Sequence, residues 1–549
     1  MISTPPIKRT SFLITLLLIS MVSACTSEPQ GNVADSEPSG LVADTILING
    51  KILTADSDFS IAEALAIDGS RILAVGDNDS INEYVAASTR VVDLQGKTVI
   101  PGLIDNHMHF IRAGQRWNLQ ARIDGVNSRS EALGIIAEKA ASMPAGEWLM
   151  VQGGWRENQF ADQRGGFTLD ELDAAAPDNP LFLQITYQAV YANSLALEAV
   201  GVSAAEGAHH VGPPLISPQP PYGLLNEQMP EVAPAQIERN VLDFIALLNR
   251  AGLTSVYDVG RPPEGDITLL ERMSTDGPLP LRVWHTLKYQ AYDPAGADAA
   301  IDLIKRSQPG STGDYLGLLG LGEHIYLPFF DLPGVTESYG SDVMDVLMKV
   351  ATAAAETGFS VHEHTMMDVT IRSFLDRLEE LNERIRLEPL RWSLAHVMNI
   401  SDESIERARN IGLTAAVHSV AMYLPTQWQP PVRAIQDSGM IWGLGTDATI
   451  VAHYQPFITL GWVVSGKSIN GQTVIEETVT REEALVAHTR NNAYLMFKEE
   501  DLGSLEVGKL ADLVVLDRDY MTVPADEIFD IESVLTMVGG RVVYESGED

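Results

Sequence analysis

The hydrophobic pattern divides the chain into two short β-type ends and a long middle in which strands alternate with helices. Residues 44–99 hold short β-type runs separated by N-G, D-G and G-K turns, and residues 511–544 hold further runs of the same character. A few strands without a helix cannot close a core of their own. We therefore expect both ends to build one small β-sandwich, from residues 44–100 and 502–549.

Residues 101–501 show a different pattern, in which apolar strand-like runs alternate with helical stretches. Such alternation predicts parallel strands with crossover helices, and about eight repeats predict a closed barrel. The expected fold is therefore α/β, a (β/α)8 TIM-like barrel. Residues 115–235 are too long for a loop between a strand and a helix, and we expect an insertion that covers the barrel mouth and shapes substrate choice.

The N-terminus has the features of a processing signal, residues 1–25. Lys8 and Arg9 precede an apolar run too short to span a bilayer. V-S-A-C resembles a bacterial lipobox and predicts lipidation of Cys25, the only cysteine; an ordinary cleaved signal is the alternative. Residues 26–43 are rich in Ser, Pro, Gly and acids and predict a flexible tether. We therefore expect an extracytoplasmic protein of the cell envelope, anchored to a membrane only through its lipid.

The charge balance limits the partners. The chain has 37 basic and 74 acidic residues, which gives a formal net charge of −37. Nucleic acids and anionic lipid surfaces should repel such a protein, so no nucleic-acid partner is expected. The simplest interpretation is a well-solvated surface, and the oligomeric state stays open.

Candidate chemistry begins in the segment V-I-P-G-L-I-D-N-H-M-H-F, where an apolar strand ends in His107 and His109. Alternate side chains of a strand point the same way, so both imidazoles could bind one metal ion; two partly exposed polar residues are the alternative. His364, His396 and Asp447 each close a further apolar run. All five should therefore lie at the carboxyl ends of barrel strands, where active sites of this fold lie.

This order of residues resembles the amidohydrolase superfamily, and the local sequence is most similar to its N-substituted formamide deformylase-like branch. The similar segments are V-I-P-G-L-I-D-N-H-M-H, N-S-L-A-L, A-G-L-T-S-V-Y-D, T-R-E-E-A-L and D-L-G-S-L-E-V-G-K-L-A-D-L-V-V-L-D. The resemblance covers roughly residues 44–549. It implies a hydrolase that cleaves a C–N bond of the amide type in a small molecule with metal-activated water, using one or two zinc ions. The metal ligands that it implies are His107, His109, Glu323, His364, His396 and Asp447.

Two of these ligands have a particular role in the prediction. Glu323, in L-G-L-G-E-H-I-Y, is the expected bridge between two metals, with His324 as the substitute if the register differs by one. Asp447 is the expected catalytic residue, which accepts a proton from the attacking water and passes it to the leaving nitrogen.

Other polar and aromatic residues are weaker candidates. His362 shares a strand face with His364 and is the chief rival ligand, and Asp368 resembles an acidic position that follows the family's fifth-strand histidine. For the aromatic candidates and for His418 and His453, a core or purely structural role is the alternative. The substrate-binding candidates are Trp155, Tyr191, His324, His418 and His453.

Two departures from the family pattern leave the substrate open. The chain has Tyr187 near a position where the family often has histidine, and Glu323 where many relatives have lysine. A deaminase, lactonase or isomerase with the same metals remains an alternative, because a fold does not determine a function. A surface lipoprotein that binds a ligand without turnover is a further alternative, although such a protein would have no reason to keep the whole ligand set.

Overall fold

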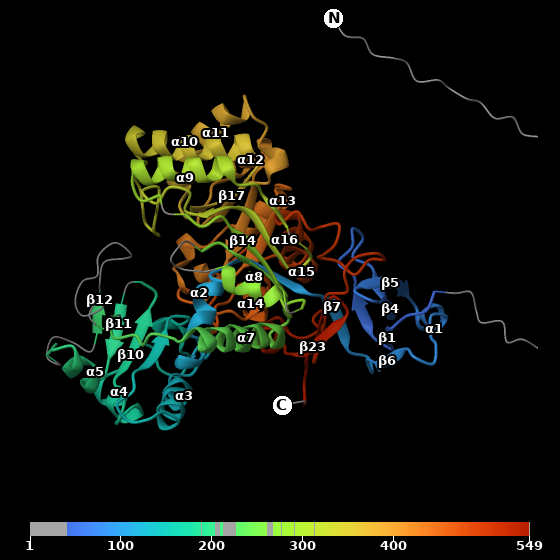
Figure 1. Cartoon of the computed structure of the whole chain (residues 1–549), viewed down its shortest axis with the longest axis horizontal. Coiled ribbons are helices and arrows are strands. Elements are labelled where there is room, and N and C mark those ends of the chain that lie inside the picture. The colour runs from blue at the N-terminus through green and yellow to red at the C-terminus, as the bar shows by residue number, and fades with distance from the viewer. Residues whose placement is uncertain are drawn as a thin grey trace, which may run out of the picture. The chain divides into compact units, whose positions relative to one another are not determined.

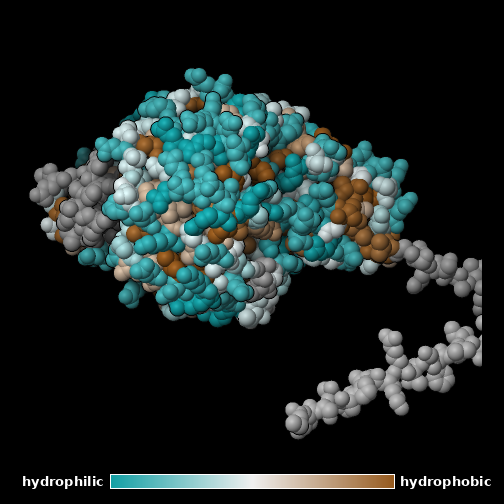
Figure 2. Space-filling view, turned by 90° about the horizontal axis from the view of Figure 1, so that it is seen from above, coloured by the Kyte–Doolittle hydropathy of each residue, from teal (hydrophilic) through white to brown (hydrophobic). Residues whose placement is uncertain are grey.

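The structure is a computed structural model that describes residues 41–187, 189–203, 209–211, 225, 227–260, 267–275, 277–289, 291–311 and 313–547. The expected processing signal, with Cys25, lies outside the described residues. Val42–Asp549 form one compact unit. In the part of the chain that is described, no helix combines the length and the apolar character that a membrane crossing requires. The face shown in Figure 2 is mainly hydrophilic, in keeping with the large excess of acidic over basic residues in the chain.

Parallel strands in the middle of the chain form a barrel sheet with the order β20-β19-β18-β17-β16-β14-β13-β8. Asp105, on the first strand, holds the two ends of this sheet together. Its Oδ1 accepts hydrogen bonds from the backbone N–H groups of His107 (3.0 Å) and Thr446 (3.1 Å), and its Oδ2 accepts one from the Thr446 hydroxyl (2.6 Å). The barrel strands are β8 (Leu103–Met108), β13 (Leu253–Asp258), β14 (Arg282–Thr286), β16 (Leu316–Glu323), β17 (Ser360–Thr365), β18 (Ser393–His396), β19 (Thr414–His418) and β20 (Trp442–Gly445).

Helices connect these strands and cover the outside of the barrel, as Figure 1 shows for α9 to α12. Each buries one face: α10 packs Met344, Leu347 and Ala351, spaced three or four residues apart, into the core. The segment T-R-E-E-A-L has a local role, because Thr480 and Glu483 form the capping box that begins α15. The parallel barrel sheet and the helices outside it confirm the predicted (β/α)8 barrel. The helices are α2 (Phe110–Gln115), α7 (Pro234–Arg250), α8 (Thr268–Thr275), α9 (Pro294–Arg306), α10 (Ser341–Thr357), α11 (Asp368–Asn382), α12 (Asp402–Asn410), α13 (Val432–Asp437), α14 (Pro456–Ser465), α15 (Arg481–His488) and α16 (Arg490–Leu495).

The two ends of the chain share a second β structure. One sheet has the order β23-β22-β21-β7-β2-β3, so that β7 from the N-terminal part pairs antiparallel with β21 from the C-terminal part, with Ile100 opposite Val514. The other sheet has the order β5-β4-β1-β6. Leu47, Val99 and Met537 meet in one buried cluster. The strands are β1 (Thr45–Ile48), β2 (Lys51–Leu53), β3 (Ile61–Ala62), β4 (Ala64–Asp68), β5 (Arg71–Gly76), β6 (Arg90–Asp93), β7 (Thr98–Pro101), β21 (Leu513–Leu516), β22 (Ser533–Val538) and β23 (Arg541–Glu545), with α1 (Asn78–Asn82) between β5 and β6.

The segment after the first barrel strand folds as a small unit with its own sheet, in the order β12-β11-β10-β9 (Figure 1). A separate hydrophobic cluster that includes Ile136, Leu149, Trp155 and Leu183 supports it. A segment with its own core can hold side chains in fixed positions, unlike a long irregular loop. Its elements are α3 (Arg129–Ala141), β9 (Leu149–Gln152), α4 (Leu169–Ala175), β10 (Leu181–Ile185), β11 (Ala189–Ala192), α5 (Ser194–Ala199) and β12 (His209–Val211).

Candidate active site

The six predicted metal ligands meet at the carboxyl ends of the barrel strands. They come from β8 and the residue directly after it, from β16, β17 and β18, and from the segment just after β20, and each is at most 7% exposed. Groups of three of these side chains bring one ligand atom each to within 4.8 Å of one another, which is close enough to share a metal ion. The sequence therefore identified residues that the fold gathers into one place, and their role as ligands stays a prediction.

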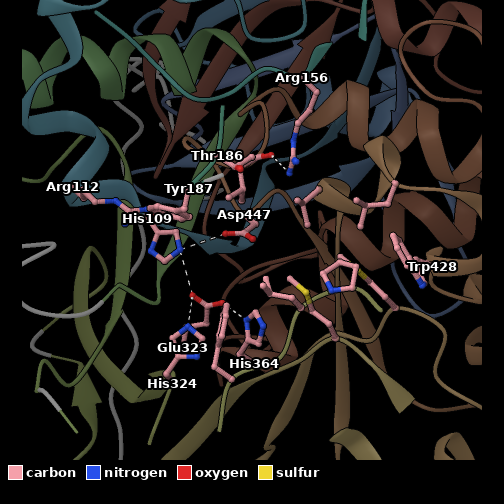
Figure 3. A pocket seen from close by; sticks show the side chains of 18 residues that line it. His109, Arg112, Arg156, Thr186, Tyr187, Glu323, His324, His364, Trp428 and Asp447 are labelled. Carbon is pink, nitrogen blue, oxygen red and sulfur yellow. Dashed lines mark hydrogen bonds and ion pairs between the residues drawn. The ribbon is translucent and has the colours of Figure 1, made fainter. Parts of the chain in front are cut away.

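The first group surrounds two carboxylates. His107 Nε2 lies 3.5 Å from Asp447 Oδ1 and 3.9 Å from Glu323 Oε2. His109 Nε2 lies 3.4 Å from the same Asp447 oxygen and 3.5 Å from the same Glu323 oxygen. Figure 3 shows His109 between the two acids. The two histidines of the H-x-H segment thus face the same pair of oxygens, as their spacing on a strand predicts.

Glu323 also faces a second group of imidazoles. Its Oε1 lies 2.7 Å from His364 Nδ1 and 3.2 Å from His396 Nε2, and its Oε2 lies 3.5 Å from His324 Nε2. One carboxylate therefore contacts both histidine groups, which is the position required of a bridging ligand. Glu323 and His324 both line the site, so the two sequence alternatives do not exclude each other.

The donor set fits a divalent cation. His107 Nε2 is buried and has no hydrogen-bond partner among the described residues, although it faces two carboxylates. A buried polar atom without a partner is costly, and a cation bound between imidazole nitrogens and carboxylate oxygens would remove that cost. Nitrogen and oxygen donors of these kinds are typical of zinc sites.

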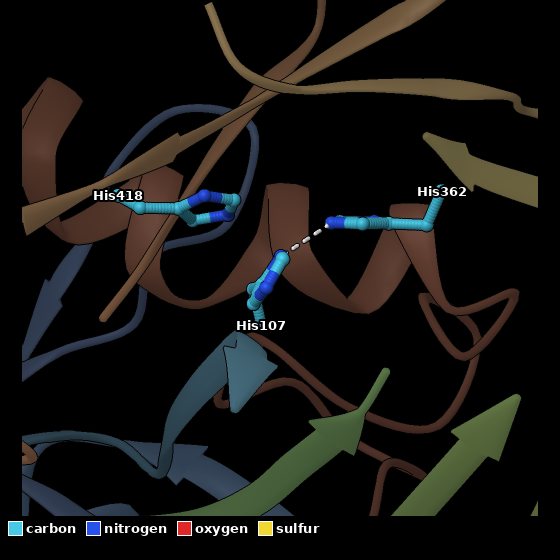
Figure 4. Close-up of side chains that lie close together, drawn as sticks. All are labelled: His107, His362 and His418. Carbon is cyan, nitrogen blue, oxygen red and sulfur yellow. Dashed lines mark hydrogen bonds between the residues drawn. The ribbon is translucent and has the colours of Figure 1, made fainter. Parts of the chain in front are cut away.

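Three of the imidazoles that face Glu323, those of His107, His364 and His396, have their other nitrogen held by a further group. His107 Nδ1 shares a hydrogen bond of 2.9 Å with His362 Nε2 (Figure 4). His396 Nδ1 lies 2.9 Å from His418 Nδ1, and His364 Nε2 lies 2.9 Å from the backbone oxygen of Asp331. Partners of this kind fix the ring orientation and the tautomer of metal-ligating histidines.

His362 and His418 lie behind this centre, and together with His107 they form a further group of imidazoles that could hold a metal ion. His362, the rival ligand, lies behind His107 on the side away from the carboxylates, and His418, a substrate-binding candidate, is fully buried behind His396. Burial and the neighbouring His107 and His396 hold the pKa of both rings well below the usual value. Both rings are thus neutral at neutral pH and can support the rings in front of them.

The two central carboxylates are ionised at neutral pH. Burial alone would raise the pKa of Asp447, but His107 and His109 outweigh that effect and lower it. Burial likewise opposes ionisation of Glu323, yet His324, His364 and His396 hold its pKa well below the usual range. The centre therefore offers negative oxygens to a cation or a proton.

A cavity of about 410 Å³ opens onto this centre. Its volume suits a small molecule. The ionisable part of its wall includes His109, Glu323, His324, His364 and Asp447, with Arg112 and Arg156 from the segment that follows β8. The apolar part of the wall is made of Phe330, Leu332, Met366, Met398, Val420, Leu424, Trp428 and Val451, together with Pro333.

Three further substrate-binding candidates do not line this cavity. Trp155 is fully buried in the core of the inserted unit, 5.4 Å from the ring of Phe167. Tyr191 is also buried there, and its hydroxyl donates to Glu157. His453 is fully buried as well. All three side chains are buried outside the cavity wall, so His324 is the substrate-binding candidate that does line the cavity.

Asp368 supports the start of a neighbouring helix. Its Oδ1 accepts a hydrogen bond of 2.9 Å from the backbone N–H of Ser401, which begins the next helical segment. Residues that sequence reasoning missed are Arg112, Arg156 and Trp428, all on the cavity wall. Arg112 could have been found, because it follows His109 by three residues; nothing in the sequence around Trp428 indicates its place.

Comparison with known proteins identifies the family of the chain. A model of the amidohydrolase family matches residues 90–544. The chain is 27% identical to "Protein LONG AFTER FAR-RED 3" of Arabidopsis thaliana, with 92% of each chain covered, and 26% identical to the N-substituted formamide deformylase of Arthrobacter pascens, with 91% of this chain and 98% of that protein covered. An uncharacterized metal-dependent hydrolase from Pyrococcus horikoshii has the same fold, with a TM-score of 0.60, 18% identity, and 88% of this chain and 99% of that chain covered. The chain thus belongs to the amidohydrolase family and is a metal-dependent hydrolase that acts on C–N bonds.

Proposed function

We propose that this enzyme hydrolyses an amide bond of a small molecule outside the cytoplasm, with zinc at the centre described above. The observation that carries the proposal is the position of Glu323, whose two oxygens face two different groups of imidazoles at the base of the cavity. This arrangement supports two ions that share one carboxylate. The residues that would hold them are His107, His109, Glu323, His364, His396 and Asp447.

When bound, such an ion lowers the pKa of water and polarises the carbonyl that is attacked. The protein must then move protons and orient the substrate. Asp447 is suited to proton transfer because it is ionised, lines the cavity and is held by His107 and His109. Its carboxylate takes the proton of the attacking water and gives it to the leaving nitrogen, so that the amide yields a carboxylic acid and an amine.

The rival functions use the same residues. A deaminase, a lactonase or an isomerase would need the same centre and would differ in the bond presented to it. A binding protein without turnover would not need an ionised, cavity-facing Asp447 between two imidazoles. A panel of amides, esters, lactones and amino-heterocycles therefore separates these functions, with metal content measured on the same preparation.

The Asp447→Asn variant tests the mechanism. We expect turnover to fall at least about 100-fold, in line with the loss of a general base, while the variant retains metal. Asp345→Asn is the matched control, because Asp345 is an exposed acid on α10 that pairs with Arg377; its turnover should stay unchanged. Turnover in Asp447→Asn equal to that of the native enzyme would falsify the role of Asp447.

The location is part of the proposal and rests on the sequence around Cys25. Lipidation there would tether the enzyme to a bacterial membrane, on the periplasmic side or at the cell surface. Expression of the full chain in a bacterium, followed by membrane fractionation of the native protein and of Cys25→Ser, tests this. The native protein should sediment with membranes and the variant should not; equal distribution of both would contradict the anchor.

A further inference from the structure

Arg156 is a cation on the cavity wall whose role the centre itself does not explain. It follows G-G-W in the inserted unit, directly before the 3-10 turn Glu157–Gln159. It lines the same cavity as Asp447, and Figure 3 shows its guanidinium group pointing from the insertion toward Thr186 and Asp447. The insertion therefore brings a positive charge to the reaction centre.

Arg156 uses only part of its hydrogen-bond donors. Its Nη2 donates to the backbone oxygen of Val451 at 3.3 Å, while the buried Nε has no partner among the described residues. No carboxylate of the described chain forms an ion pair with it. A guanidinium group has five N–H donors, so Arg156 keeps donors beyond this one bond.

Two other arginines of the same unit, unlike Arg156, have carboxylate partners. Arg122 Nε donates to Asp124 at 2.7 Å, and Arg129 forms a two-point ion pair with Glu171. Burial lowers the pKa of Arg156 to about 10, against the opposing effects of Tyr423 and Asp447, so that the group stays charged at neutral pH. A buried charge without an anionic partner is costly in a folded protein unless a ligand supplies the partner.

The acids of the cavity cannot fill this role. The oxygens of Glu323 face His364, His396 and the H-x-H pair, and Asp447 Oδ1 faces His107 and His109. Both carboxylates are therefore engaged at the centre. The described residues therefore supply no free anion for Arg156, and the substrate is the molecule that enters this cavity.

We propose that Arg156 binds a carboxylate of the substrate, so that the enzyme acts on amides that carry a carboxylate and an apolar group. The inference rests on the proposed amide hydrolysis. A planar guanidinium group with free, parallel N–H donors matches a carboxylate in a two-point contact. Trp428, Phe330 and Leu424 line the same cavity and supply an apolar surface for the second part of the substrate.

Binding is tested first, without turnover, using the full chain after metal removal. The probes are 3-phenylpropanoate and 3-phenylpropan-1-ol, which differ in charge and contain no bond for the enzyme to cleave. The native protein should bind the carboxylate at least about 10-fold more tightly than the alcohol, and Arg156→Gln should lose this preference. Arg164→Gln, at an exposed position of the same inserted unit, is the control and should keep it. Absence of the preference in the native protein, or its survival in Arg156→Gln, would overturn the proposal.

Turnover is tested second, on the zinc-loaded enzyme, with racemic N-acetylphenylalanine and with N-acetyl-2-phenylethylamine, which lacks the carboxylate. Arg156→Gln should raise KM for the first amide at least about 10-fold and change kcat/KM for the second less than about 3-fold. Arg156→Lys should recover part of the loss, because it keeps the charge but not the planar fork. Equal losses on both amides would contradict carboxylate binding. A charge preference in binding with no hydrolysis of any amide would instead contradict the proposed function alone.

Discussion

His107 Nδ1 and His362 Nε2 share a buried hydrogen bond of 2.9 Å, which joins the strand β8 to the strand β17. The bond leaves His107 Nε2 directed at Asp447, 3.5 Å away. The orientation of one predicted ligand is therefore set by a residue that does not face the cavity.

Replacement of His362 should weaken metal binding without removing a ligand. His362→Phe fills the same space but cannot hold His107, and the affinity for zinc should fall about 10- to 100-fold. His362→Gln should restore part of it, because an amide can still bond to the ring. Chelator competition measures the affinity. His285→Gln is the control, since His285 bonds to the backbone of Thr286 outside the cluster; equal affinity in His362→Phe and native protein would contradict the prediction.

The bridging position of Glu323 predicts a change in metal content. After equilibration with excess zinc and desalting, the native chain should retain two ions and Glu323→Gln no more than one, as measured by elemental analysis. Glu363→Gln is a matched control on the neighbouring strand. Burial raises the pKa of Glu363 well above the usual value, so the residue is neutral and glutamine preserves its charge. The same zinc content in native protein and Glu323→Gln would show that Glu323 is not a bridge.

A buried ion pair connects the barrel to the β-sandwich. Arg282 of β14 donates through Nε (2.8 Å) and Nη2 (2.7 Å) to Asp512, which also accepts a hydrogen bond from the backbone N–H of Gly539. Arg282→Met leaves the Asp512 carboxylate buried and unpaired, and should lower the free energy of unfolding by about 3–5 kcal/mol. Arg272→Met, in an exposed pair with Glu238, should change it by less than about 1 kcal/mol. Urea unfolding compares the two; similar effects would contradict the prediction.

The pair between Arg129 and Glu171 predicts a pH dependence of stability. The Arg129 guanidinium, helped by Thr168 and opposed by burial, lowers the pKa of Glu171 to about 2. A carboxylate with a depressed pKa contributes stability above its unfolded pKa of about 4.3, and the contribution is lost as pH falls toward 2. The urea midpoint of Glu171→Gln should therefore lie below that of the native protein at pH 7, and the difference should shrink below about pH 4.5. Glu380→Gln, at an exposed site on α11, should show no such trend.

The fold and the candidate metal ligands could be predicted from the sequence because both produce local sequence patterns. Alternating strands and helices predict a barrel, and a histidine or an acid that ends an apolar run is placed at the barrel mouth by the fold itself. His107 and Asp447 could therefore be found without knowledge of their contacts. Glu323 could be found in the same way, since it ends β16.

The cavity wall could not be found in this way, because its residues come from segments without a repeating pattern. Trp155 and Arg156 are neighbours in the sequence, yet the first packs into the core of the inserted unit and the second lines the cavity. Only the fold of the insertion decides which of the two faces the substrate. His418 shows the converse: it ends a strand as a ligand would, but lies behind His396.

The pairing of β7 with β21 also has a consequence for how the chain folds. Ile100 and Val514 lie opposite each other in one sheet although the entire barrel separates them along the chain. During synthesis β7 cannot pair with β21 until nearly the whole polypeptide has been made. Contacts between residues so far apart in the sequence form slowly. The terminal sheet thus closes only on a completed chain, and a prematurely stopped product exposes an unpaired strand edge to aggregation and proteolysis.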